Sequence, residues 1–156
     1  MAEEPPTKPQ PFSRALLVAL MVAVLYGAVL VAVDGIISLI TDRDVISEPE
    51  AGPLIGPIMA TVAVGVLFFS ILGGLSPTSR KTRLMVGRAL STALLIFLLS
   101  PLAGSIGYAL GQPQLASGIP FFLRYLLSPF VLASALIAIL PVMVLPWIAR
   151  ARSGAR

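Results

Sequence analysis

The chain has 156 residues, of which 57% are hydrophobic and only 12% are charged, and its formal net charge is +4. An average soluble domain has about 25% charged residues, so this composition cannot coat a water-facing surface and indicates a membrane protein. There is neither cysteine nor histidine, which excludes disulfides, thiol redox chemistry, Cys/His zinc sites and His- or Cys-ligated haem or iron–sulfur clusters. We therefore expect no cofactor and no metal.

Four apolar stretches are each long enough to cross a bilayer of about 30 Å at about 1.5 Å per residue. They lie at about residues 15–38, 53–74, 84–110 and 121–148. A lone strand cannot satisfy its backbone in lipid, so each stretch predicts a helix. The predicted fold class is an all-α membrane protein with one four-transmembrane-helix bundle over residues 14–149.

The two ends of the chain are expected to lie outside the bundle. Residues 1–13 contain four prolines and predict a disordered tail, and residues 150–156 predict a basic tail. Glu3 and Glu4 precede the first apolar stretch, which is also too long for a signal peptide. We therefore expect the first span to be retained. No segment outside the spans is long enough to form a soluble catalytic domain.

The distribution of lysine and arginine predicts the orientation in the membrane, because cytoplasmic segments carry an excess of both. Only Arg43 and Arg124 fall on one side of the predicted spans. The other side has nine basic residues: Lys8, Arg14, Arg80, Lys81, Arg83, Arg88, Arg150, Arg152 and Arg156. The prediction is a multi-pass protein of the plasma (inner) membrane with both termini in the cytoplasm (N-in/C-in). The basic residues flank apolar runs instead of forming one face, so nucleic acid is not an expected partner.

Small residues recur every four positions and predict faces on which helices approach closely. The candidate packing residues are Ala15, Ala19, Ala23 and Gly27 in the first span and Ala103, Gly107 and Gly111 in the third. These faces either hold the bundle together or, in the first span, dock another membrane protein or a second copy of the chain. Both interpretations stay open at this point.

The sequence Leu-Leu-Ser-Pro occurs twice, at residues 98–101 and 126–129. Each proline removes a backbone donor and frees a carbonyl, and both prolines are predicted at similar depth from the outer ends of their spans. We hypothesise a shallow outward pocket built from Asp34, Ser100, Tyr108, Arg124 and Ser128. The alternative is that the kinks only shape the packing and each serine bonds its own helix.

Two charged residues are attached to predicted spans. Asp34 follows Arg14 by twenty residues, about 30 Å of straight helix, which predicts a position at the outer boundary of the membrane. There it is solvated, pairs with Arg43 or Arg124, or takes part in transport. Arg88 lies one turn inside the third span and is expected to extend to the lipid headgroups.

The size, the four-span plan, the excess of arginine over lysine and the short basic middle loop together resemble small four-span actinobacterial membrane proteins of unknown function. This resemblance covers the whole chain, contains no specific motif and implies no activity. Small multidrug transporters have a similar size, but the glutamate they use deep in the first span has no counterpart here.

The sequence has no P-loop, nucleophile elbow or H-E-x-x-H motif, so we expect no enzyme. The favoured function is that of an accessory or assembly partner of a larger membrane complex. The alternative is a small oligomeric transporter or channel that uses the proline-kinked outer half.

Overall fold

The described part of this computed structural model comprises residues 11–42, 46, 52–74, 82–113 and 115–153, and all of its regular secondary structure is helical. Its α-helices are α1 (Pro11–Thr41), α2 (Ile55–Gly74), α3 (Thr82–Gly111), α4 (Gly118–Leu126) and α5 (Pro129–Ser153), with a short 3-10 helix at Leu115–Ser117. The all-helical class is therefore confirmed. Residues 1–10 and 154–156 of the predicted tails lie outside the described residues. Residues 11–13 begin α1, so the disordered tail was predicted too long.

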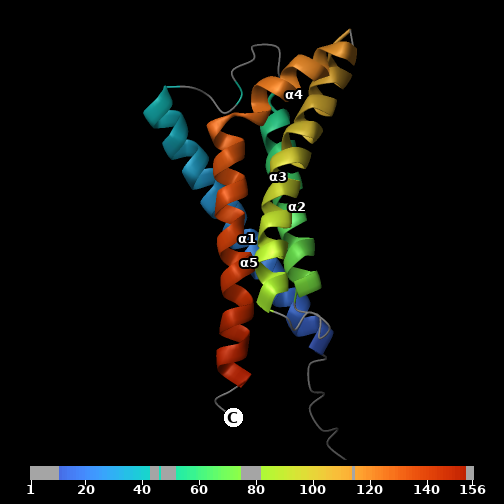
Figure 1. The fold of residues 1–156 in the computed structure, drawn as a ribbon. Coiled ribbons are helices and arrows are strands. Elements are labelled where there is room, and N and C mark those ends of the chain that lie inside the picture. Colours follow the sequence, from blue (N-terminus) through green and yellow to red (C-terminus); the bar gives the residue numbers. More distant parts are fainter. Residues whose placement is uncertain (1–10, 43–45, 47–51, 75–81, 114, 154–156) are drawn as a thin grey trace, which may run out of the picture.

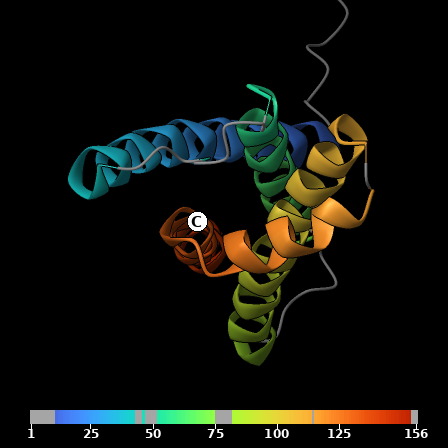
Figure 2. The same cartoon turned by 90° about the horizontal axis from the view of Figure 1, so that it is seen from above.

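The long helices form a bundle in which α3 packs against both α2 and α5, while α1 packs against α2 and α5 (Figure 1). Helix α1 starts and α5 ends at the same end of the bundle. At the opposite end, here named the α4 end, the short helix α4 lies across the tops of the long helices (Figure 2). Helix α1 is inclined, and near the α4 end its last turns stand apart from the other helices in both views.

Helices α1, α2 and α3 are each long and apolar enough to cross a membrane. They begin and end within four residues of the first three predicted stretches. Helices α4 and α5 meet the same criterion only as a pair, bent by 57°. The single helix predicted over residues 121–148 was therefore wrong.

Proline explains the break between α4 and α5. Pro129 has no N–H and disfavours helical geometry at Ser128, so α4 ends and a new helix starts. Pro129 is the first residue of α5, a position where the missing donor is not needed. Pro101 has a different effect, because α3 continues through it as one helix. The chain is thus bent at Pro129, as predicted, whereas at Pro101 no break interrupts the helix.

The core between the long helices consists of small and aliphatic side chains, which let the helices approach closely. Its buried members are Ala19, Tyr26, Leu30, Ala63, Leu67, Ile71, Ala89, Ala93, Ile96, Ala135, Ala138 and Val142. A second cluster near the α4 end joins α2, α4 and the start of α5 through Ile55, Met59, Phe121, Tyr125 and Val131. Together the two clusters extend along the bundle.

The predicted packing residues of α1 lie mainly inside the bundle. Ala19 and Ala23 are buried, and Ala15 and Gly27 are half-buried. A Cβ at Gly27 would lie 3.4 Å from a methyl group of Val64 on α2. This face therefore contributes to packing within the chain.

The predicted packing residues of α3 are less enclosed. Ala103 and Gly107 are half-buried, whereas Gly111 is exposed and has no atom near its Cβ position. A tighter contact between α3 and α2 is at buried Gly104, where a Cβ would lie 2.6 Å from the sulfur of Met59. The pair Gly107 and Gly111 is therefore not the tightest contact of α3.

Helix α4 is held against α3 by one glycine and a stack of aromatic rings. A Cβ at Gly118 would lie 2.9 Å from the backbone oxygen of Ser105, so only glycine allows this approach. The Phe121 ring stacks between Tyr108 and Tyr125, with ring centroids 4.7 and 4.3 Å apart. Tyr108 and Phe121 thus fix α4 over the end of the bundle.

Arg88 contacts the far end of α2 from its place in α3. A Cβ at Gly73 or Gly74 would lie 2.6 or 2.9 Å from a guanidinium nitrogen of Arg88. The C-terminal end of a helix carries partial negative charge and attracts a cation. The guanidinium therefore sits at the C-terminal end of a neighbouring helix.

Candidate functional site

The buried face of α1 brings its one carboxylate into the bundle. Ala19, Ala23, Tyr26, Leu30 and Asp34 follow one another in steps of four, three, four and four residues. Such steps average close to 3.6 residues per turn, so all five side chains share one face. Because the first four are buried against the other helices, Asp34 points inward at the level where α1 begins to separate.

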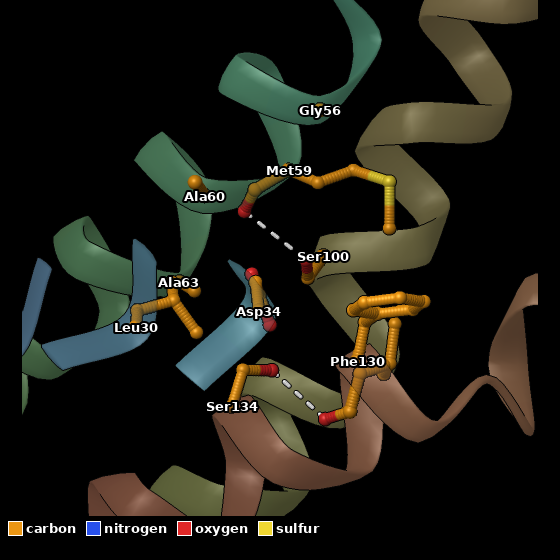
Figure 3. A pocket seen from close by; sticks show the side chains of 10 residues that line it. Leu30, Asp34, Gly56, Met59, Ala60, Ala63, Ser100, Phe130 and Ser134 are labelled. Atoms are coloured by element: carbon orange, nitrogen blue, oxygen red, sulfur yellow. Dashed lines mark hydrogen bonds between the residues drawn. The ribbon is translucent and has the colours of Figure 1, made fainter. Parts of the chain in front are cut away.

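Asp34 lines a small cavity between all four long helices (Figure 3). The α2 wall is made of small residues, among them Gly56, Ala60 and Ala63, which leave the space open. Ser100 of α3 and Ser134 of α5 complete its polar part, and the Asp34 carboxylate lies between these two serines. A carboxylate and two hydroxyls from three helices therefore meet in one place.

The hydroxyl protons around the cavity are all committed to backbone oxygens. Ser100 Oγ donates to the carbonyl oxygen of Met59 at 3.0 Å, which ties α3 to α2. Ser134 Oγ donates to the carbonyl oxygen of Val131 at 2.8 Å. Tyr26 donates its hydroxyl to the carbonyl oxygen of Ser134 at 2.9 Å, which ties α1 to α5. The wall therefore presents oxygen lone pairs, and no hydroxyl proton, to whatever lies inside.

The carboxylate itself is incompletely satisfied. Asp34 Oδ1 is buried and has no hydrogen-bond partner among the described residues. A charged group that leaves water without compensation is costly. Two features reduce that cost: Gly56 and Phe130, in the first turns of α2 and α5, also line the cavity, and the N-terminal end of a helix favours negative charge.

The volume of the cavity, about 30 Å³, limits what it can hold. A polar site needs at least about 10–15 Å³ and two to four polar partners to hold one water. Pockets for small organic ligands are about 300–1,000 Å³. The site therefore has room for one water or one small ion, and none for a metabolite.

The structure brings together two of the five residues proposed for the outward pocket. Asp34 and Ser100 line the cavity between the long helices. Tyr108, Arg124 and Ser128 do not line it. Tyr108 stacks on Phe121, Arg124 is exposed on α4, and Ser128 lies at the break before α5.

Sequence reasoning missed Ser134 and Met59. Ser134 is the only polar side chain in the run from Phe130 to Leu140, and a lone polar residue inside a span was the available signal. The repeated Ser-Pro pair directed attention to Ser128 instead. Met59 contributes through its backbone oxygen, which no sequence pattern reveals.

No group of three or more His, Cys, Asp or Glu side chains gathers in a metal-binding arrangement within the described ranges. Residues 10–156 match the family described as "Family of unknown function (DUF6121)". The chain belongs to DUF6121. No curated protein and no solved structure matches it. For this DUF6121 member, function must therefore be argued from the geometry above.

Proposed function

We propose that the chain spans the plasma membrane four times, with α4 and α5 forming one bent span and both termini in the cytoplasm. Three helices long enough to cross and a fourth bent pair support this topology. The orientation is supported by nine basic residues that the sequence predicts on the cytoplasmic side, against two predicted on the other side. The α4 end then faces outward.

Single cysteines test this topology, because the chain has none of its own. We expect Glu48→Cys and Ser117→Cys to react with a membrane-impermeant thiol reagent in intact cells, and Ser79→Cys to react only after the cells are opened. Labelling of Ser79→Cys alone in intact cells would overturn the orientation. Labelling of Glu48→Cys without Ser117→Cys would contradict the number of spans.

The role that we propose is a non-enzymatic one, as an accessory or assembly partner of another membrane protein or of a second copy of the chain. The observation that carries it is the end of α1, which stands apart from the bundle (Figure 1). There Leu39 and Ile40 are 85% and 79% exposed, and Gly35 has no atom near its Cβ position. A transmembrane helix gains van der Waals contacts by packing on another helix, and this segment offers an open surface for one.

A photoreactive amino acid at Ile36 tests the partner role. Ile36 on the open end of α1 and Leu94 on α3 are equally exposed, at 55% each, so Leu94 is the matched control. We expect a protein adduct from position 36 in native membranes and none from position 94. Mass spectrometry of the adduct distinguishes a second copy from another protein. Equal yields of protein adducts at both positions, or none at position 36, would contradict this role.

A small oligomeric transporter or channel is the second candidate, and the carboxylate inside the bundle favours it. Ionisable residues within membrane spans often mark ion or proton pathways. Vesicles containing the purified protein would then dissipate a Na⁺ or proton gradient faster than protein-free vesicles, and Asp34→Asn would abolish the difference. If vesicles with and without the protein dissipate the gradients at equal rates, the transporter role is excluded and only the assembly role remains.

A further inference from the structure

The charge of the cavity around Asp34, and its lack of free hydrogen-bond donors, limit which ligand it can bind. It contains one carboxylate, and the hydroxyl protons of Ser100 and Ser134 are bound to backbone oxygens. An occupant that satisfies Asp34 Oδ1 must therefore donate a proton or carry positive charge. Anions and pure acceptors are disfavoured, because they would meet only oxygen lone pairs and a negative charge.

The surroundings fix the size of that positive charge. The lining residues of α2, α3 and α5 include no titratable or charged side chain. On α1 itself the nearby titratable group is Tyr26, whose hydroxyl is bound to the backbone of Ser134. One carboxylate neutralises one positive charge, whereas a divalent ion would leave an unpaired charge at high cost. Calcium also takes six to eight oxygen ligands and magnesium retains several waters, which a cavity of about 30 Å³ does not accommodate.

We propose that the Asp34 cavity is a binding site for a single monovalent cation, either Na⁺ or a proton, held by the Asp34 carboxylate with Ser100 and Ser134. The site joins all four long helices, since α1 supplies the charge, α3 and α5 supply hydroxyl oxygens, and α2 supplies the small wall. Occupation of the site therefore ties the separating end of α1 to the rest of the bundle. This inference names the cation site that the second candidate function would use, but it requires neither transport nor a partner, so it can hold where no gradient is dissipated.

The test is the thermal stability of the purified full-length protein in detergent. In one series, increasing Na⁺ replaces N-methyl-glucamine at constant ionic strength and pH. In the other series, pH is varied in the absence of Na⁺. The variant is Asp34→Asn, and the matched control is Asp42→Asn, which removes an exposed carboxylate just beyond the end of the same helix. Na⁺ in large excess over its Kd is expected to raise Tm by roughly 5 °C in the wild type and in Asp42→Asn, and not in Asp34→Asn.

The Na⁺ series and the pH series show which of the two cations, Na⁺ or a proton, occupies the site. If a proton is the occupant, the folded state binds it more tightly than the unfolded state, so Tm of the wild type rises as pH falls while Asp34→Asn lacks this increment. If Asp34→Asn does not fold, Ser134→Ala is the second variant, because it keeps the carboxylate. We expect it to need a Na⁺ concentration about tenfold higher or more for the same rise in Tm. A wild type indifferent to both Na⁺ and pH, or an Asp34→Asn variant that responds like the wild type, would overturn the proposal. So would stabilisation by Mg²⁺ or Ca²⁺ through Asp34 where Na⁺ has no effect.

Discussion

Replacing Leu67 with alanine is expected to lower the free energy of unfolding by about 1–3 kcal/mol. Leu67 of α2 is fully buried in the core that the long helices share. In water such a substitution costs about 2–5 kcal/mol, which combines transfer and cavity terms. In a membrane the lipid is as apolar as the core, so the lost packing contacts carry most of the cost.

Leu94→Ala is the control for Leu67→Ala, because Leu94 on α3 is exposed at the surface of the bundle. We expect its effect on the unfolding free energy to be within about 0.5 kcal/mol. Both variants are compared by equilibrium unfolding in the same detergent. An equal loss in the two would mean that Leu67 is not packed in the core shared by the long helices.

Replacing Ala23 with leucine is expected to destabilise the protein by about 1–3 kcal/mol through overpacking. Ala23 is buried on the face by which α1 packs on α2 and α5, so a leucine there must displace the neighbouring side chains. Ala28→Leu introduces the same group on the exposed side of α1 and should be neutral.

Thermal unfolding and size-exclusion chromatography measure both outcomes. If Ala23→Leu leaves stability and oligomeric state as unchanged as Ala28→Leu does, α1 does not pack through this face. Dissociation of an oligomer without loss of monomer stability would instead assign the face to contacts between copies.

The positions of the first three long helices could be predicted because lipid imposes a minimum apolar length. The effect of a proline inside an apolar run could not. Pro101 lies inside α3, which continues through it, and its side chain is fully buried. Pro129 became the first residue of α5, which separates α4 from it. The sequence Leu-Leu-Ser-Pro is thus continuous helix at residues 98–101 and a helix break at residues 126–129. Tertiary packing, and not the local sequence, accounts for the difference.

The small-residue pattern predicted the buried face of α1 only in part, for a geometric reason. A strict step of four residues advances about 40° per step around a helix of 3.6 residues per turn. The stripe from Ala19 and Ala23 therefore drifts off the buried face, reaching half-buried Gly27 and then exposed Gly35. Mixing steps of three and four leads instead to Tyr26, Leu30 and Asp34.

A count of residues along α1 predicts how far Asp34 lies from Arg14, but not which of the other helices it faces. Helix α1 is inclined relative to the other long helices and continues to Thr41 (Figure 1). Inclination depends on packing against neighbouring helices, which a count along the sequence does not contain. Asp34 therefore lies among Ser100 and Ser134 instead of beside Arg124.

Reaction of the unmodified protein with two carbodiimides tests most directly whether Asp34 lies inside a membrane-embedded bundle. A hydrophobic carbodiimide reaches carboxyl groups within membranes, and a water-soluble one reaches those in water. A cavity of about 30 Å³ admits a water and excludes the soluble reagent. We expect mass spectrometry of native membranes to find Asp42 modified by the soluble reagent and Asp34 only by the hydrophobic one. Modification of both residues to the same extent by the soluble reagent would place Asp34 at the water-exposed rim and contradict this account.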